Sequence, residues 1–180
     1  MSDIATELAR LHELTGADYS RQVEHIARMN VFHPLPDAPN ILTVGGEGGD
    51  DYDRLIAAAR KAVEHGYTVY MLPNPKGMRT ADFIFERKGT YKIVELKTVL
   101  GKASAGGSLM SSIGQTNRVL LNIATNYNAR RLASDIKSYF EANSMAKEVI
   151  IFKGKKIISV KRLFCEQPAY FKKFCQKYVK

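Results

Sequence analysis

Three consecutive runs of β-forming residues, between positions 67 and 99, constrain the fold of this chain more than any other feature. Tyr, Val, Ile and Phe dominate these runs, and RKGT between the second and third is short enough to close a hairpin. Apolar residues at helical spacing precede the runs and alternate with shorter apolar runs after them. This order, α-β-β-β-α-β-α-β-β, predicts an α/β fold in which helices flank a mixed sheet. The expected strands are 67–72, 81–86, 91–99, 119–123, 148–152 and 156–160, and the expected helices are 52–65, 108–118, 128–142 and 168–180.

The N-terminal part of the chain has a different pattern. Residues 1–31 carry apolar side chains at helical spacing, interrupted at Thr15-Gly16, which predicts an α-hairpin of two short helices. Residues 32–49 contain HPLPDAPN and GGEGG, and this Pro/Gly-rich composition favours a linker. We therefore expect a helical N-terminal segment, a linker at 32–49, and a main domain over 50–180.

Charge is distributed unevenly along the chain. The 27 Lys and Arg against 18 Asp and Glu give a net charge of +9. Residues 1–90 hold 10 basic and 13 acidic side chains, whereas residues 91–180 hold 17 basic and 5 acidic ones, a net charge of +12. Such a cationic segment indicates a polyanionic partner. Nucleic acid is the leading candidate, and an anionic membrane surface or an ordinary solvated basic surface is the alternative.

Several classes of protein do not fit this sequence. No apolar stretch approaches the roughly 18 to 20 residues of a membrane helix, and the charged start MSDIATELARLHEL does not resemble a signal peptide. We therefore expect the protein to act in the cytoplasm, without a membrane partner. Cys165 and Cys175 are expected to be free thiols.

Two carboxylates and a lysine form the strongest chemical pattern. If RKGT closes a hairpin so that Glu86 opposes Tyr91, then Asp82 directly opposes Glu95, with Cβ atoms about 5 Å apart on one face. Two such carboxylates repel each other unless a divalent cation lies between them, and Mg²⁺ favours carboxylate oxygen. Lys97, two residues beyond Glu95 on the same face, is placed to orient an attacking water or to stabilise developing negative charge. The alternative is a surface hairpin in which Lys97 only neutralises the acids.

The arrangement of Asp82 and Glu95-Leu96-Lys97 resembles the PD-(D/E)XK nuclease signature, with Ala81 in place of the proline that precedes the aspartate in the strict motif. The block from LIAAARKAVEHGYTVYML to YKIVELKT, with SSIGQTNRVLLNI and EVIIF-KGKK-IISVKR after it, resembles the nuclease domain of contact-dependent growth inhibition toxins over about residues 50–162. The resemblance implies a PD-(D/E)XK core, metal-dependent cleavage of tRNA or other nucleic acid at Asp82, Glu95 and Lys97, and a cognate immunity protein as partner.

Further residues are candidates for supporting roles. Asp53, at the start of the 52–65 helix, is a possible third metal ligand, although acids there also serve as caps and complement the helix dipole. Gln115 lies on a polar helix face and is a candidate to order the attacking water. Lys102 lies in the Gly-rich segment 101–107, expected to be a loop that folds over substrate. The remaining candidates for phosphate contacts are Arg130, Arg131, Lys153, Lys155 and Lys156.

These observations predict a metal-dependent endonuclease. Asp82, Glu95 and Asp53 are its metal ligands for Mg²⁺ or Mn²⁺, and Lys97 and Gln115 complete the catalytic set. RNA is the expected substrate, with tRNA favoured by the resemblance, and DNA is the alternative. A different class remains open, namely a non-catalytic nucleic-acid-binding or interaction protein of a phage or mobile element.

Overall fold

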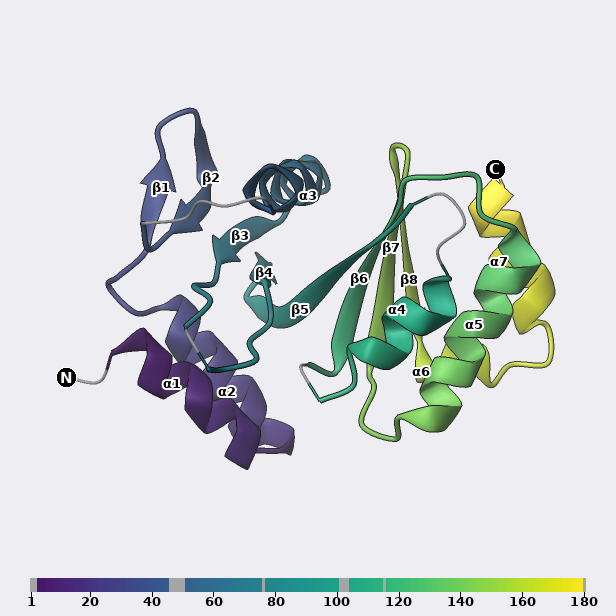
Figure 1. Cartoon of the computed structure of the whole chain (residues 1–180), viewed down its shortest axis with the longest axis horizontal. Coiled ribbons are helices and arrows are strands. Elements are labelled where there is room, and N and C mark those ends of the chain that lie inside the picture. Colours follow the sequence, from purple (N-terminus) through teal and green to yellow (C-terminus); the bar gives the residue numbers. More distant parts are fainter. Residues whose placement is uncertain (1–2, 46–50, 76, 101–103, 115, 180) are drawn as a thin grey trace. The chain divides into compact units, whose positions relative to one another are not determined.

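The computed structural model describes residues 3–45, 51–75, 77–100, 104–114 and 116–179, and it divides into two compact units, Met1–Val94 and Glu95–Lys180. The chain is an α/β protein whose eight strands are hydrogen-bonded in chain order, β1 to β8, with parallel and antiparallel pairs (Figure 1). The predicted mixed sheet flanked by helices is thereby confirmed. The division falls inside one strand, β5, and not at the predicted linker.

Unit 1 begins with the predicted α-hairpin. Helix α1 (Ile4–Arg10) is followed by a short 3₁₀ turn, η1 (Leu11–Glu13), and then by helix α2 (Gly16–Ala27). Asp3 caps α1, because its carboxylate accepts a hydrogen bond of 2.8 Å from the Thr6 backbone N–H. The apolar faces of both helices pack with residues of the later strands into one core. This core includes Leu8, Leu11, Val23, Ile26, Leu72, Ala81, Ile84 and Ile93.

The predicted linker contains two strands, so its assignment over residues 33–43 is wrong. Strand β1 (His33–Leu35) pairs antiparallel with β2 (Ala38–Thr43), and β2 pairs parallel with β3 (Thr68–Met71). Ile41 is fully buried, and Thr43 is nearly so. The prolines conceal this alternation of apolar residues. Pro34 is tolerated because β1 is an edge strand of the sheet, and Pro39 of β2 lies where the β1–β2 register shifts.

A helix and a tight hairpin complete unit 1. Helix α3 (Tyr52–Glu64) connects β2 to β3, and β3 pairs antiparallel with β4 (Phe83–Arg87). Strand β4 pairs antiparallel with the first half of β5 (Thr90–Val99) in the predicted register, with Ile84 opposite Ile93 and Glu86 opposite Tyr91. Positive φ angles of 53° at Lys88 and 81° at Gly89 let two residues close the turn, which is tighter than the four-residue loop expected.

Unit 2 contains the second half of β5 and three further strands, β6 (Arg118–Ile123), β7 (Glu148–Lys153) and β8 (Lys156–Lys161). The sheet residues Val99, Val119, Leu121, Val149 and Ile151 share one core with residues of the helices. Tyr170, Phe174 and Tyr178 of the last helix are buried in this core, so the aromatic tail packs as a helix. The helices of unit 2 are α4 (Ala105–Ser111), α5 (Ala129–Ala142), α6 (Arg162–Cys165) and α7 (Tyr170–Val179).

The segment expected to be a loop over 101–107 is partly helical. Ser104 caps α4 by accepting a hydrogen bond of 3.2 Å from the Gly107 backbone N–H, so Gly106 and Gly107 lie inside the helix. The predicted helix over 108–118 therefore begins and ends earlier than expected. Residues 101–103 lie outside the described residues, and the loop expected there stays a prediction.

Candidate functional site

The backbone of Asp82 is fixed between two strands of unit 1. Its N–H donates to the Val94 carbonyl at 3.1 Å, and its own carbonyl accepts from the Leu72 N–H at 3.0 Å. The side chain is half-buried, and the next residue, Phe83, begins β4. The apolar strand ADFIFE, predicted from its alternation and aromatic content, thus holds Asp82 at a defined position.

Glu95 and Lys97 lie on β5 in unit 2. Glu95 pairs with Val119 of β6, and Lys97 pairs with Leu121, so both side chains project from the face that carries Val99 into the core. Only 7% of Glu95 is exposed, whereas Lys97 is half-buried. A carboxylate with so little exposure requires compensating hydrogen bonds or positive charge.

The register of the β4–β5 hairpin determines which residues come next on the two strands. Pairing continues through Ile84 opposite Ile93 to Phe83 opposite Val94, as the sequence predicts. Asp82 directly precedes β4, and Glu95 follows Val94 on β5. The ladder does not include the predicted Asp82–Glu95 pair, because the Asp82 N–H donates to the Val94 carbonyl. Because the two units divide between Val94 and Glu95, the first carboxylate belongs to unit 1 and the second, with Lys97, belongs to unit 2.

The supporting candidates for metal binding are less defined. Asp53 lies exposed in the first turn of α3, where a carboxylate complements the helix dipole, and the neighbouring Asp51 forms an ion pair with Arg54. Among the described residues, no group of three or more His, Cys, Asp and Glu side chains lies close enough to hold a metal ion. The described residues thus do not group Asp53 with Asp82 and Glu95, and Asp53 as third metal ligand stays a prediction. Gln115 and Lys102 lie outside the described residues.

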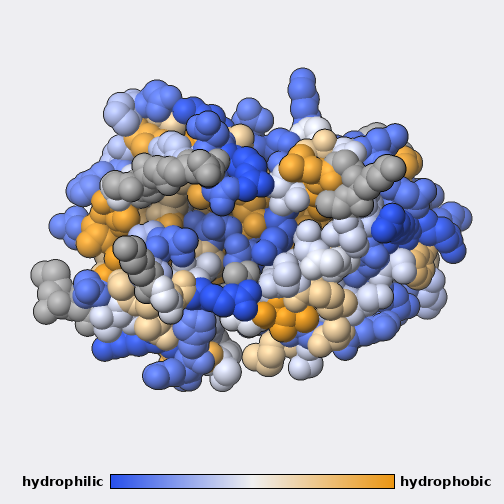
Figure 2. All heavy atoms as spheres, viewed as in Figure 1, coloured by the Kyte–Doolittle hydropathy of each residue, from blue (hydrophilic) through white to orange (hydrophobic). Residues whose placement is uncertain are grey.

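Three of the predicted phosphate contacts are exposed on unit 2. Arg130 and Arg131 lie at the start of α5, 5.4 Å from the ring centre of Phe171 and 5.2 Å from that of Tyr127. Lys155 is exposed in the turn between β7 and β8. The face shown in Figure 2 is mostly hydrophilic over α5 and α7.

The other two lysines have an intramolecular role that sequence reasoning missed. The Lys156 ammonium group donates to the Tyr178 carbonyl at 3.0 Å, and the Lys153 ammonium lies 3.7 Å from the Tyr178 ring centre. Together they hold the C-terminal end of α7, where positive charge also complements the helix dipole. Burial, with a smaller contribution from Lys156, lowers the pKa of Lys153. A lysine pair in a β-turn gives no sign of this contact, because it depends on where α7 packs.

Comparison with solved structures finds a CdiA-CT/CdiI toxin and immunity complex from Burkholderia pseudomallei. The TM-score is 0.45 and the sequence identity is 16%, over 65% of this chain and 92% of that chain. That complex contains the class of toxin that the sequence resembles, but likeness at this level establishes neither a PD-(D/E)XK core nor an activity. No family model matches the chain, and no curated protein matches it. Among the described residues, no helix is both long and apolar enough to cross a membrane.

Proposed function

We propose that the chain is a metal-dependent nuclease in which Asp82 and Glu95 hold one divalent cation and Lys97 assists the attacking water. The observation that carries this proposal is the β4–β5 register. It pairs the strands up to Phe83 and Val94, which are the sequence neighbours of Asp82 and Glu95. Lys97 follows Glu95 on the same face of β5. Two carboxylates that converged there would repel each other, and a divalent cation between them would relieve that repulsion.

The donor set fits Mg²⁺ or Mn²⁺, which take carboxylate oxygen and retain waters. When bound, such a cation neutralises charge on a phosphodiester and supplies a more acidic water. Asp82 and Glu95 would orient that water toward phosphorus. The Lys97 ammonium, a point charge, would stabilise the negative charge that develops on the phosphoryl oxygens. Asp53 remains the proposed third ligand, and Gln115 remains a proposed residue for positioning water.

The charge of the units supports nucleic acid as the substrate. Residues 95–180 hold 16 basic and 5 acidic side chains, a net charge of +11, whereas residues 1–94 hold 11 basic and 13 acidic ones, a net charge of −2. A cationic unit that carries Glu95 and Lys97 suits a polyphosphate. RNA is the proposed substrate and DNA the alternative within the same chemistry. The sequence resemblance adds the proposals of a toxin role and a cognate immunity protein.

The test replaces Asp82 by Asn, Glu95 by Gln and Lys97 by Ala, one at a time. We expect each change to abolish cleavage of tRNA in Mg²⁺, with affinity measured in Ca²⁺ kept within a few-fold, because the many other cations carry most of the binding. Asp82→Asn and Glu95→Gln should also remove the Mg²⁺-dependent rise in melting temperature. Cleavage of duplex DNA, measured in parallel, decides between the two substrates.

Matched controls lie in the same hairpin. Glu86→Gln removes an equal charge on β4 but keeps an oxygen to accept the 3.0 Å hydrogen bond from the Gly89 N–H. Lys92→Ala removes a lysine of β5 on the face opposite Lys97. Both controls should cleave like the wild type. Wild-type cleavage by Asp82→Asn or Glu95→Gln would contradict the metal site. Tight binding without cleavage by any form of the protein would favour the non-catalytic alternative.

A further inference from the structure

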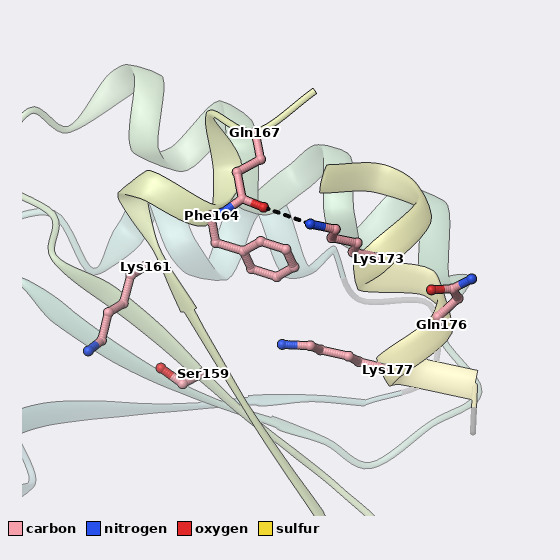
Figure 3. A pocket seen from close by; sticks show the side chains of 7 residues that line it. All are labelled: Ser159, Lys161, Phe164, Gln167, Lys173, Gln176 and Lys177. Atoms are coloured by element: carbon pink, nitrogen blue, oxygen red, sulfur yellow. Dashed lines mark hydrogen bonds between the residues drawn. The ribbon is translucent and has the colours of Figure 1, made fainter. Parts of the chain in front are cut away.

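A second candidate site lies within unit 2, at the edge of the sheet. The edge strand β8, the short helix α6 and the last helix α7 line an open hollow of about 550 Å³ (Figure 3). Pockets that bind small molecules occupy roughly 300 to 1,000 Å³. The residues that line the hollow are Ser159 and Lys161 of β8, Phe164 and Gln167 at α6, and Lys173, Gln176 and Lys177 of α7.

The described lining of the hollow is cationic and contains no carboxylate. None of the ion pairs among the described residues involves Lys161, Lys173 or Lys177. Lys173 donates to the Gln167 carboxamide oxygen at 3.2 Å, and the Lys177 ammonium lies 4.8 Å from the Phe164 ring centre. Both partners are neutral. An anion in the hollow would therefore be attracted by three lysines and met by no carboxylate of the described lining.

The elements that carry these lysines are held firmly in place. Helix α7 is anchored by its tyrosines, since the Tyr170 hydroxyl donates to the Ala133 carbonyl at 2.7 Å and the Tyr178 hydroxyl donates to the Tyr127 carbonyl at 2.8 Å. Lys173 and Lys177 are four residues apart and so lie on the same face of α7. Ser159 and Lys161 alternate with buried residues of β8, and the Ser159 hydroxyl donates to Glu148. Packing therefore fixes the backbone positions from which these side chains project.

One aromatic ring lies among these charges. Phe164 is half-buried and packs edge-on against Tyr170, with 5.3 Å between the ring centres, and Figure 3 shows it between Lys177 and Gln167. Ammonium groups bind phosphate as point charges, and aromatic rings stack on unpaired bases. We propose that the hollow binds one nucleotide of a single-stranded nucleic acid, with its phosphate at the lysines and its base against Phe164. The nucleic-acid partner rests on the proposed function, but Asp82, Glu95 and Lys97 are not among the residues that line the hollow.

The experiment measures binding without cleavage. The full chain carrying Asp82→Asn is titrated in EDTA with a fluorescent single-stranded RNA, across a series of salt concentrations. Lys161→Gln with Lys177→Gln removes two charges from the hollow. The matched control, Lys147→Gln with Lys172→Gln, removes two charges from exposed lysines of unit 2 that do not line it. Circular dichroism and the melting temperature verify that both variants fold.

We expect the hollow variant to lose severalfold more affinity than the control. Its log–log salt slope should also be shallower by roughly 0.7 for each lost phosphate contact. Phe164→Leu should lower the affinity for the RNA by about fivefold or more. It should leave unchanged the affinity for an abasic strand with the same number of phosphates. Equal weakening by the two double variants would overturn the site, because only net charge would then matter.

A free phosphate is the other source of the same chemistry. Inorganic phosphate is therefore added as a competitor in each titration, at constant ionic strength. If it displaces RNA from the control but not from the hollow variant, and Phe164→Leu has no effect, the hollow binds free phosphate and the nucleotide proposal is wrong. If cleavage fails in every form but the hollow variant still loses affinity, only the nuclease proposal is contradicted.

Discussion

At the scale of single residues, the two thiols of unit 2 have different environments. Cys165 is buried in the core with 3% of its surface exposed, and burial raises the pKa of its thiol to about 11. Cys175 is half-buried on α7. We expect a thiol reagent at pH 8 to modify Cys175 in the folded protein and Cys165 only after unfolding. Mass spectrometry of the labelled peptides measures this, and rapid labelling of Cys165 in the native state would contradict the packing of unit 2.

The same thiol predicts a dependence of stability on pH. Its pKa is higher in the folded state, about 11, than the ordinary value of 9.0. Between these values the unfolded chain loses the proton first, so the stabilising contribution is complete below pH 9 and is lost as pH rises toward 11. Urea unfolding from pH 8 to 10.5 should show a steeper loss of stability for the wild type than for Cys165→Ala.

Buried tyrosines also contribute to the pH dependence of stability in both proteins. Burial also raises the pKa of Tyr139, Tyr170 and Tyr178, so both proteins lose stability at high pH. Because the Cys165 thiol and the Tyr170 hydroxyl interact, the difference between the two curves reports the thiol together with its effect on Tyr170. Parallel curves would mean that Cys165 is ionised as easily in the folded as in the unfolded state.

At the scale of elements, the N-terminal α-hairpin is part of unit 1. Its Leu8 and Ile26 share a core with Ile84 and Ile93, the residues of β4 and β5 that lie two positions from Asp82 and Glu95. Without residues 1–49 these side chains would lose their cover, so a fragment that begins near residue 50 should not fold cooperatively. The sequence predicts a linker between this segment and a main domain over 50–180, and the shared core argues against such independence.

A point substitution tests the same packing. Ile26 is fully buried, so Ile26→Ala should lower the free energy of unfolding by about 2 to 5 kcal/mol. Ser20→Ala, at an exposed position of the same helix, should change it by no more than about 0.5 kcal/mol. Chemical denaturation followed by circular dichroism measures both. Equal, small effects would show that the α-hairpin is an appendage, as the linker prediction had implied.

Helix α4 offers a second test at this scale. Gly107 lies in the helix, and a Cβ added there would lie 3.8 Å from its nearest neighbour atom. Gly107→Ala should therefore raise the free energy of unfolding by roughly 0.5 to 1 kcal/mol. At Gly106 a Cβ would come within 3.1 Å of the Asp135 carboxylate, which accepts a 2.7 Å hydrogen bond from Tyr127. Gly106→Ala should therefore raise the free energy of unfolding less than Gly107→Ala does, or lower it. Urea titrations of the two variants give the comparison.

The elements that sequence predicted are those specified locally. The β4–β5 register follows from side-chain alternation and turn length, and it places Phe83 opposite Val94 as expected. Strands β1 and β2 escaped prediction because burial of Ile41 depends on its distant partner Val69. The contacts of Lys153 and Lys156 with Tyr178 depend on tertiary packing in the same way. For the candidate site, the hairpin register was predictable as far as Phe83 and Val94, whereas the Asp82 N–H bond to the Val94 carbonyl and the division after Val94 were not.

At the scale of the whole molecule, the change in charge coincides with the structural division. The unit from Glu95 onward holds a net charge of +11, and the unit before it holds −2. Exposed cations that are not used in packing, such as Lys155, are available to phosphates, whereas Lys156 is engaged with α7. Nucleic-acid affinity should therefore depend on selected cations of unit 2 and not on the total charge of the chain.

Binding should therefore depend steeply on salt concentration, and the slope should change only when particular cations of unit 2 are replaced. Each neutralised phosphate contributes a log–log slope of roughly −0.7 to −0.9 through counterion release, so about five contacts give a slope near −4. Lys155→Glu should lower the affinity for tRNA and for duplex DNA alike. It should also make the salt slope shallower by the amount that about one phosphate contact contributes. Arg21→Glu causes the same change of charge in unit 1, at an exposed residue paired with Asp18, and should alter the slope little. Salt titrations in Ca²⁺ measure both. If Arg21→Glu flattened the slope as much as Lys155→Glu, binding would follow net charge alone, and a slope near zero for both ligands would remove nucleic acid as the partner.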